Sequence, residues 1–504
     1  MGALVTLSAR IVAAPRTTAV PTEIPSVANA AALRLLEGNT TTIPVATARG
    51  MAAEGDGGGG SFYWSTVPGV DDGWDVLNAG TGSWNRIGAG RSVVGSTPIA
   101  RRVIIDDPRP INLRDCGGAM GNAENVDSAL TLMFQRMKAQ RKSALIPMGH
   151  YRFTSTLALE LSDSDDVTQL AIVGDNAADE VFWAAPVTPG IHPNHTILEW
   201  DGSTKQNMVK LRGRGMRIAG ITFRAKPGRA VDACIDIDSP DDNSAGKVGS
   251  RIFIERCVFV GNPGGGYGSV DFGVALGREN PAYGNLEDMV FTECLFQSLV
   301  EGGIYNANTS GQSKSTSITR CRFNGTIDGI DDGKFAIKQF NGSIQTSDAC
   351  SIGHMAEAAI QYLASPYDTL KFEDLNCEAL YQFLTLGVTT DPCPVKICNC
   401  RFAITDNVNG DGRFIVWSGA GPFRIEGTAW EYGGTYDPED IHILHATTVP
   451  ARLKSEGNAY MSSDPIRSIS GGGLMGLTYD TLADVYRQSG VTTFIPSALN
   501  VETP

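Results

Sequence analysis

The chain has 504 residues, 42% of them hydrophobic, with 58 glycines and a formal net charge of −14. This length exceeds one ordinary compact domain, and the acidic balance argues against a nucleic-acid-binding protein, which would present a basic face. No run of 18 apolar residues occurs, so we expect no membrane span, and the apolar start interrupted by Arg10 does not predict a secretory signal.

Residues 1–105 differ in composition from the rest of the chain and contain the segments EGDGGGGSFYWS at 54–65 and TGSWNRIG at 81–88. The four consecutive glycines are not followed by the Gly-Lys-Ser/Thr of a phosphate-binding loop, so we interpret them as a turn between short strands. We expect the tryptophans of this region to pack in a small β-rich module or at a contact between subunits: Trp64, Trp74 and Trp84. Residues 1–105 are therefore predicted to form a small N-terminal β-rich module and neck.

Residues 106–142 are predicted to contain an amphipathic helix, with Asn125 as its N-cap. Apolar residues recur on one face at a period of 3.6 residues: Val126, Leu130, Met133, Phe134 and Met137. A stack of strands exposes unpaired edges and core at its end, and therefore needs a cap. We expect this segment to supply a neck strand and the capping helix.

A six-residue pattern of apolar residues recurs down the middle of the chain. Its copies read IAGITF at 218, IERCVF at 254, FTECLF at 291, ITRCRF at 318, FEDLNC at 372, ICNCRF at 397 and IEGTAW at 425, with a degraded copy, SDACSI, at 347. Each copy is rich in β-branched and aromatic residues and too short for a helix, which predicts a strand. Further short strands lie between copies, including AVDACIDI from Ala230 and SVDFGVAL from Ser269.

Three short strands per period indicate an all-β fold, a right-handed parallel β-helix in which each coil stacks on the next. We expect the β-helix over 143–455 and a C-terminal cap or tail over 456–504. Cysteines share one position of the repeat: Cys257, Cys294, Cys321 and Cys400. We interpret them as buried thiols rather than ligands, because free cysteine is commonly buried and no zinc-type spacing is present. No metal site and no cofactor are predicted.

The segment INLRDCGGAMGN, followed by the helix and then LIPMGHYRF, resembles the opening of the pectate-lyase-like superfamily of β-helix proteins. The upstream DGGGGSFYW and GSWNRI are similar to a module at the front of phage tailspike and tail-fibre proteins of that superfamily. The resemblance implies a homotrimer in the virion tail, assembled in the host cytoplasm and attached to other tail proteins through residues 1–105. It also implies binding, and in many members cleavage, of host surface polysaccharide, but it carries over no catalytic residue.

Two long steps of the repeat mark the candidate binding surface. The extra residues are SPDDNSAGKVGS at 239–250 and GRENPAYGNLED at 277–288. Insertions at matching places in adjacent coils would emerge side by side and form the wall of a cleft. The candidate substrate-binding residues are Asp241, Asp242, Arg278, Glu279, Tyr283 and Tyr305. The alternative interpretation is that these loops are only solvated or pack between subunits.

Candidate catalytic carboxylates are Asp331 and Asp332, within TIDGIDDGKFAIKQ at 326–339, together with Glu301. Glycoside hydrolysis requires such pairs, because one carboxyl group donates a proton while the other activates water or attacks. The Asp-Asp pair followed by Gly-His at 353–354 resembles polygalacturonases, although the spacing of the other motifs differs. The alternative is that these aspartates only form turns, because Asp-rich turns commonly connect the strands of a β-helix. A lyase would need a basic residue, for which Lys334 or Lys338 could serve.

The sequence therefore favours a phage tailspike-type receptor-binding protein that recognises host cell-surface polysaccharide and could cleave it as a glycoside hydrolase or a lyase. The alternative is a non-catalytic structural tail fibre, adaptor or adhesin. A free pectin-degrading enzyme is disfavoured by residues 1–105 and by the absence of a predicted signal.

Overall fold

The structure is a computed structural model of the chain. It describes residues 25–36, 38, 45–49, 60–66, 76–79, 81–86, 110–117, 122–160, 170–175, 195–238, 251–261, 266–279, 286, 288–309, 315–327, 330–331, 333–363, 368–387, 393–404, 413–417, 422–432, 442–446, 452–462, 467–470, 479–482, 485–488 and 491–494. The chain divides into two compact units, Met1–Pro108 and Arg109–Pro504.

The described residues of the first unit form a five-stranded sheet and a short helix. Its elements are β1 (Ser26–Val27), α1 (Ala30–Leu35), β2 (Val45–Ala48), β3 (Gly60–Ser65), β4 (Val76–Ala79) and β5 (Gly82–Arg86), and the strand order is β1-β2-β3-β5-β4. Trp64 and Trp84 pack edge to face with ring centroids 5.1 Å apart, a favoured aromatic geometry. The indole of Trp84 also donates a hydrogen bond to the Leu36 carbonyl at 2.6 Å. These residues hold a small β module, whereas Trp74 lies outside the described residues.

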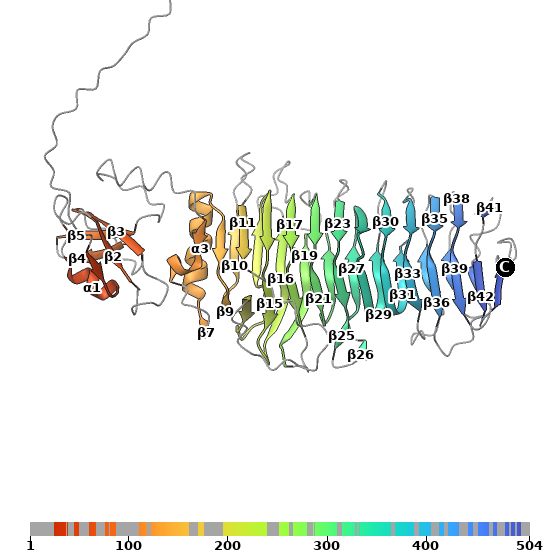
Figure 1. The fold of residues 1–504 in the computed structure, drawn as a ribbon, viewed down its shortest axis with the longest axis horizontal. Helices are drawn as coiled ribbons and strands as arrows, with labels where there is room; N and C mark the ends of the chain where they lie inside the picture. Colours follow the sequence, from red (N-terminus) through yellow and green to blue (C-terminus); the bar gives the residue numbers. More distant parts are fainter. Residues whose placement is uncertain are drawn as a thin grey trace, which may run out of the picture. The chain divides into compact units, whose positions relative to one another are not determined.

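The second unit is a right-handed parallel β-helix, as predicted, and Figure 1 shows its coils stacked one after another. The strands form three columns. Column 1 contains β6 (Ile111–Asn112), β8 (Ala144–Ile146), β11 (Leu170–Gly174), β14 (Met216–Ala219), β17 (Ile252–Glu255), β20 (Met289–Thr292), β23 (Ser315–Thr319), β28 (Ser343–Ser347), β30 (Leu370–Glu373), β32 (Val395–Cys398), β35 (Pro422–Glu426), β38 (Arg452–Glu456) and β41 (Tyr479–Leu482).

Column 2 contains β7 (Asn122–Asn125), β9 (Gly149–Phe153), β12 (Thr196–Trp200), β15 (Thr222–Ala225), β18 (Val258–Val260), β21 (Leu295–Gln297), β24 (Arg322–Asn324), β33 (Arg401–Ile404), β36 (Ala429–Tyr432), β39 (Ala459–Ser462) and β42 (Val485–Gln488). Column 3 contains β10 (Leu157–Glu160), β13 (Val209–Arg212), β16 (Ala230–Asp238), β19 (Ser269–Leu276), β22 (Gly302–Asn306), β27 (Phe335–Gln339), β34 (Arg413–Trp417), β37 (His442–Ala446) and β40 (Arg467–Ser470).

Two long strands, β29 (Ser351–Tyr362) and β31 (Asn376–Leu386), run through both column 2 and column 3. A hairpin of β25 (Thr326–Ile327) and β26 (Ile330–Asp331) emerges between columns 2 and 3. Parallel pairing continues as far as β42, within the residues for which a C-terminal cap was expected, and the antiparallel strand β43 (Val491–Phe494) then pairs with β42.

The corner between columns 1 and 2 is a sharp turn that needs one residue in the left-handed conformation. Arg256, Glu293, Arg320 and Asn399 hold this place in their coils with φ between 49° and 55°, and Gly427 holds it with φ 55°. Their backbone N–H groups bond to the next coil, for example Arg256 to Thr292 O at 2.8 Å. Only glycine and, to a lesser extent, asparagine adopt this conformation without steric cost, so the pairing between coils must impose it on the others.

The residue after this corner explains the cysteines of the repeat. Its thiol donates to a carbonyl in column 1 of the preceding coil, as Cys294 Sγ does to Ile254 O at 3.3 Å and Cys350 Sγ does to Ile318 O at 3.4 Å. Asn458 makes the same contact with Ile425 O at 3.2 Å. All ten cysteines are free and buried, as predicted, and burial raises the pKa of the Cys257 thiol to about 12.

Aromatic rings stack along the inside of column 2. Phe223, Phe259, Phe296 and Phe323 pair in register, with centroid separations of 5.4, 4.8 and 4.6 Å along the stack. These separations follow from the spacing of neighbouring strands, about 4.8 Å. At the N-terminal end of the stack, α3 (Asp127–Gln140) buries its apolar face in the same core. The Asn125 side chain accepts from the Asp127 N–H at 2.9 Å.

The left-handed corner yields a stability prediction. Arg256 is exposed, with φ 49°, so Arg256→Val places a β-branched residue where it is most strained and is expected to cost about 1–2 kcal/mol. Arg256→Asn should be close to neutral. The measurement is the urea midpoint of each variant. The matched control is Arg322→Val in strand β24, where a β-branched residue suits the backbone; an equal loss at both positions would contradict the corner argument.

Candidate functional site

The face of column 3 carries the candidate site. The two long insertions predicted from the repeat follow β16 and β19, and these strands pair directly, with Ile235 opposite Val274 and Ile237 opposite Leu276. The ends of β16 and β19 are therefore neighbours. Asp241, Asp242 and Tyr283 lie outside the described residues, so their binding role stays a prediction.

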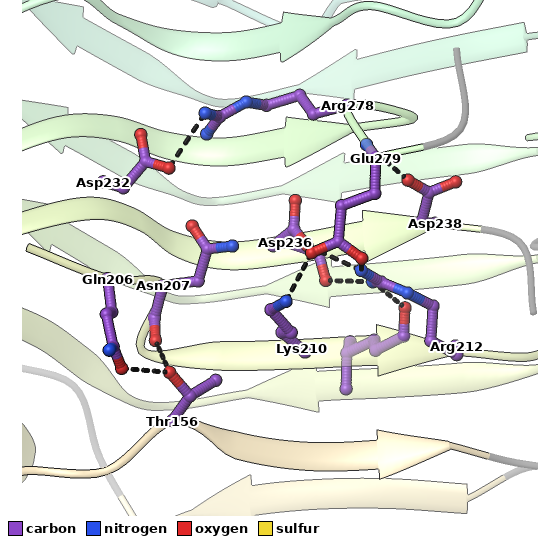
Figure 2. Close-up of polar contacts among 11 residues, drawn as sticks. Thr156, Gln206, Asn207, Lys210, Arg212, Asp232, Asp236, Asp238, Arg278 and Glu279 are labelled. Atoms are coloured by element: carbon purple, nitrogen blue, oxygen red, sulfur yellow. Dashed lines mark hydrogen bonds and ion pairs between the residues drawn. The ribbon is translucent and has the colours of Figure 1, made fainter. Parts of the chain in front are cut away.

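A charged cluster surrounds Arg212 at the end of β13 (Figure 2). Its guanidinium donates to Asp236 Oδ2 at 2.9 Å and to Glu279 Oε2 at 2.7 Å. Lys210 forms a second ion pair with Glu279, whose backbone N–H donates to Asp238 Oδ2 at 2.9 Å. Arg212 and Asp236 are almost completely buried, whereas 39% of the Glu279 side chain is exposed. Two carboxylates therefore share one buried guanidinium.

The two carboxyl groups of this cluster have pKa values shifted in opposite directions. Burial raises the pKa of Asp236, and the charge and hydrogen bond of Arg212 offset this only in part. Partial burial also acts to raise the pKa of Glu279, but hydrogen bonds from Lys210 and Arg212 lower it overall. Asp236 is covered, however, so this pair stabilises the base of the site rather than meeting a substrate directly.

A row of accessible carboxylates lies at the other end of the column 3 strands. Asp232 and Asp271 occupy matching places in β16 and β19, because the residues on either side of them pair in register. Glu301 follows in the next coil, and its N–H donates to Asp271 O at 3.0 Å. Each carboxylate has one cation: Arg278 for Asp232 at 2.8 Å, Lys205 for Asp271, and Lys334 for Glu301 at 2.7 Å.

The middle carboxyl group of this row is perturbed. Burial raises the pKa of Asp271, whereas the hydrogen bond and charge of Lys205 lower it. The flanking carboxylates of Asp232 and Glu301 raise it again, and the resulting pKa is higher than that of an ordinary aspartate. Only 15% of the Asp271 side chain is exposed, against 32% for Glu301. Stacking on adjacent coils thus places a carboxyl group of raised pKa next to a more exposed carboxylate.

Aromatic side chains lie beside the acidic row. Phe272 stacks on Tyr305 with ring centroids 5.0 Å apart and an interplanar angle of 20°. The guanidinium of Arg278 lies over the Phe272 ring, 5.1 Å from its centroid, and Phe335 contacts both rings at 6.4 Å. Phe272 and Tyr305 are partly exposed and lie outside the hydrophobic core. A partly exposed aromatic surface next to paired carboxylates is suited to holding a sugar ring against its polar groups.

Of the residues predicted from sequence, the structure places Arg278, Glu301 and Tyr305 along the acidic row and its aromatic side chains. Glu279 belongs instead to the Arg212 cluster at the other end of the same strands. Asp331 lies in β26, and Asp332 is outside the described residues. After the hairpin that carries Asp331, the Gly333 N–H donates to the Gly325 O at 2.9 Å, and the next residue, Lys334, pairs with Glu301. The catalytic role assigned to Asp331 and Asp332 stays a prediction.

Sequence reasoning missed Asp232, Asp271 and Arg212. A signal for the first two was present, because AVDACIDI and SVDFGVAL both place aspartate after valine at the same distance from the strand start. No comparable signal marked Arg212, whose importance comes from its contact with Glu279, 67 residues further along the chain.

A second charged cluster lies on column 2 and has a structural role. Glu199 accepts from Arg224 at 2.8 Å and from Arg152 at 2.6 Å, and lies 3.1 Å from His150. Burial acts to raise the pKa of Glu199, but His150, Arg224 and Arg152 together lower it to about 2. Glu199, Arg224 and His150 are buried, which leaves little access for a ligand.

The described residues contain no group of three or more His, Cys, Asp or Glu side chains arranged to hold a metal ion. Within the same ranges, no helix has the length and apolar character needed to cross a membrane.

No protein-family model matches the chain, and no curated protein matches its sequence. Among solved structures, it is similar to the enzymatically active domain of tailspike protein 4 from bacteriophage CBA120, at 12% identity and a TM-score of 0.55, covering 88% of this chain and 55% of that one. It is also similar to the Acinetobacter phage vB_ApiP_P1 tailspike protein, at 13% identity and a TM-score of 0.45, covering 92% and 71%.

A third similar structure is tailspike protein gp49 of Acinetobacter baumannii bacteriophage Fri1, named as a capsular polysaccharide depolymerase. It shares 14% identity at a TM-score of 0.45, with 91% of this chain and 75% of that one covered. The chain spans about half the length of the CBA120 structure. At this identity, the likeness to the CBA120 domain shows a shared fold.

The buried cluster yields a second stability prediction. Arg212→Leu leaves Asp236 buried without its cation and is expected to cost about 3–5 kcal/mol, whereas Arg212→Leu with Asp236→Leu should recover most of that loss. Urea unfolding of both variants measures the difference. Arg217→Leu removes an exposed ion pair with Glu255 and should cost no more than about 1 kcal/mol. A loss at Arg212 no larger than at Arg217 would show that the cluster is not a buried unit.

Proposed function

We propose that the chain is a phage tailspike-type receptor-binding protein that binds a polysaccharide of the bacterial surface on column 3 and hydrolyses its glycosidic bonds. Residues 1–105 would attach it to other proteins of the virion tail, and three copies would assemble as a homotrimer. The β-helix shared with a tailspike domain named as enzymatically active supports this assignment. The resemblance of the segments at 54–65 and 81–88 to a tailspike module supports the role of the first unit.

One observation carries the proposed chemistry: Asp271 has a raised pKa and lies next to the Glu301 carboxylate on the adjacent coil. Strand spacing of about 4.8 Å brings the two backbones close enough for their carboxyl groups to fall in the window of roughly 5–10 Å used by glycosidases. A carboxyl group that keeps its proton is the acid of such a pair, and the other carboxylate is its base or nucleophile.

In the proposed reaction, Asp271 gives its proton to the glycosidic oxygen as the bond to the anomeric carbon breaks. Glu301 either attacks that carbon to form a glycosyl ester, which a water molecule deprotonated by Asp271 then hydrolyses, or removes a proton from the water that attacks the carbon directly. Lys205 and Lys334 then stabilise the carboxylates that remain. Phe272 and Tyr305 would hold the sugar ring by stacking, and the Arg278 guanidinium borders the same surface.

The charge pattern favours hydrolysis over elimination. A lyase abstracts a proton next to the carboxylate of a uronic acid, and that carboxylate must first be neutralised by a cation. On column 3, however, five cations each already pair with a carboxylate of the protein: Lys205, Lys210, Arg212, Arg278 and Lys334. Lys338 of β27 has no such pair among the described residues, and its ammonium lies over the Phe335 ring, 5.6 Å from the centroid. The positive charge of the five paired cations is therefore already offset by the protein itself.

Substitution of the two carboxylates tests the proposal. Glu301→Gln and Asp271→Asn should each lower the release of reducing ends from a cleaved surface polysaccharide about 10²–10⁴-fold, with binding retained. Lys205→Met removes a charge that lowers the pKa of Asp271, so the alkaline limb of the pH–rate profile should move to higher pH. Lys226→Met, at a partly exposed lysine paired with Asp201, is the matched control and should leave that limb in place.

The native mass of the full chain is measured in the same preparation and should equal three chains. Full activity in both carboxylate variants would contradict the assignment of the catalytic pair. Binding without any release of reducing ends from wild type would instead support the alternative predicted from sequence, a non-catalytic fibre or adhesin.

A further inference from the structure

One lysine on the face of column 3 has a charge that the described part of the chain does not offset. The ammonium of Lys338, in β27, forms no ion pair and no hydrogen bond with a described residue, whereas Lys334 of the same coil pairs with Glu301 at 2.7 Å. Lys338 is partly exposed. Its positive charge is therefore open to a ligand.

The register places Lys338 directly beside the aromatic surface of column 3. Tyr305 lies opposite Lys338 in the preceding coil. The ammonium of Lys338 lies 5.6 Å from the centroid of the Phe335 ring, which in turn lies 6.4 Å from the centroids of both Phe272 and Tyr305. Phe340, two residues further along, also contacts the Tyr305 ring at 6.4 Å. The lysine therefore stands at the edge of the Phe272–Tyr305 stack.

A glycine holds the ring beneath this ammonium in place. Gly302 lies in register between Phe272 and Phe335, and a Cβ atom on it would lie only 2.3 Å from the Phe335 ring. The two rings therefore approach each other across the intervening coil, to 6.4 Å, where two strand spacings would separate them by about 9.6 Å. Phe335 is buried in this position, so the surface over which the ammonium lies is rigid.

Contact with an aromatic ring positions a cation without neutralising it. The face of the ring attracts the ammonium through its quadrupole but carries no net charge, and the three N–H donors of a lysine remain available to acceptors. Gln361, opposite Lys338 in the next coil, can add a further donor. Its amide nitrogen has two hydrogens, and one bond goes to Glu357 Oε2 at 2.8 Å.

The acidic row and Lys338 border different sides of the aromatic surface. Four residues separate Lys338 from Lys334, and four separate Tyr305 from Glu301, which is about 13 Å along a strand. A sugar stacked on the rings can therefore direct its glycosidic bond toward the acidic row and a charged substituent toward Lys338. The same substituent beside the acidic row would be repelled by its carboxylates.

We propose that Lys338 is a specificity-determining residue that binds an anionic substituent, a carboxylate or a phosphate group, of a sugar on the Phe272–Tyr305 stack. This inference rests on the proposed function and specifies its substrate class, an acidic polysaccharide. An ammonium is a compact charge without the planar fork of a guanidinium, so it accommodates either anion.

The test uses the full chain carrying Glu301→Gln, so that bound glycan is not cleaved. Its binding is measured on an array of defined bacterial polysaccharides with neutral, uronic-acid or phosphorylated repeat units. We expect the tightest binding in one of the two acidic classes, which identifies the anion, and we expect this binding to weaken as salt is added. Lys338→Met should weaken it about 10- to 100-fold and remove most of the salt dependence, whereas Lys338→Arg should retain both.

Lys396→Met, at a partly exposed lysine of column 1 that pairs with Glu373 at 3.5 Å, is the matched control and should bind as its parent does. Circular dichroism checks that each variant is folded. A merely structural role of Lys338 would lower the binding of neutral and acidic glycans alike. That result, unchanged acidic binding in Lys338→Met, or tightest binding of neutral glycans by the parent would each overturn the inference.

Failure of this inference is distinguishable from failure of the proposed function. If only the role of Lys338 is wrong, wild type cleaves its glycan, Asp271→Asn abolishes that cleavage, and Lys338→Met leaves the choice of glycan unchanged. If the hydrolysis is wrong, acidic glycans bind through Lys338 but wild type releases no reducing ends. Absence of binding to every glycan would contradict both.

Discussion

Each coil of the β-helix hydrogen-bonds to the coil before it and the coil after it, so every side chain lies about 4.8 Å from its partners in register. This constraint decides which side chains stabilise the molecule. Identical side chains that attract one another stabilise the stacking of the coils. The stacked rings of column 2 are the example: Phe223, Phe259, Phe296 and Phe323. The same constraint fixes the conformation at the corners, where Arg256 and Glu293 adopt a conformation that they would otherwise avoid.

Charged residues stacked in the same way repel one another, and column 3 shows how the chain manages this cost. Asp232, Asp271 and Glu301 succeed one another on three coils, and each has a cation from elsewhere in the chain. The compensation is incomplete for the middle residue, which has an acid on both sides and a raised pKa. Burial, together with the repulsion that stacking adds, thus produces a carboxyl group suited to proton donation, beside a carboxylate suited to the complementary role.

The fold could be predicted largely from the sequence, because the fixed spacing between coils requires a similar short pattern of residues in each coil. Each copy of the repeat contains its own strand and corner, so the spacing from IERCVF at 254 to ICNCRF at 397 was sufficient to indicate stacked coils. The cysteines could be interpreted as core for the same reason. Their thiol contacts with the preceding coil, such as Cys294 with Ile254, give a physical reason for their recurrence that the repeat alone did not show.

The site was only partly predictable, because it depends on register between strands separated by insertions of unequal length. Arg278, Glu279, Glu301 and Tyr305 were selected from the irregular steps of the repeat. Asp271 was not, since its perturbed state depends on neighbours 39 residues before it and 30 residues after it. The path of the Arg278 side chain back to Asp232 is likewise a property of the folded face, not of the local sequence.

The central claim is that column 3 hydrolyses a glycosidic bond, and cleavage in water enriched in heavy oxygen tests it most directly. Hydrolysis predicts that mass spectrometry finds one heavy oxygen atom at each new reducing end, and that Glu301→Gln abolishes this incorporation. Unsaturated products without heavy oxygen would show elimination instead, and would contradict the assignment of Asp271 and Glu301 as a hydrolytic pair.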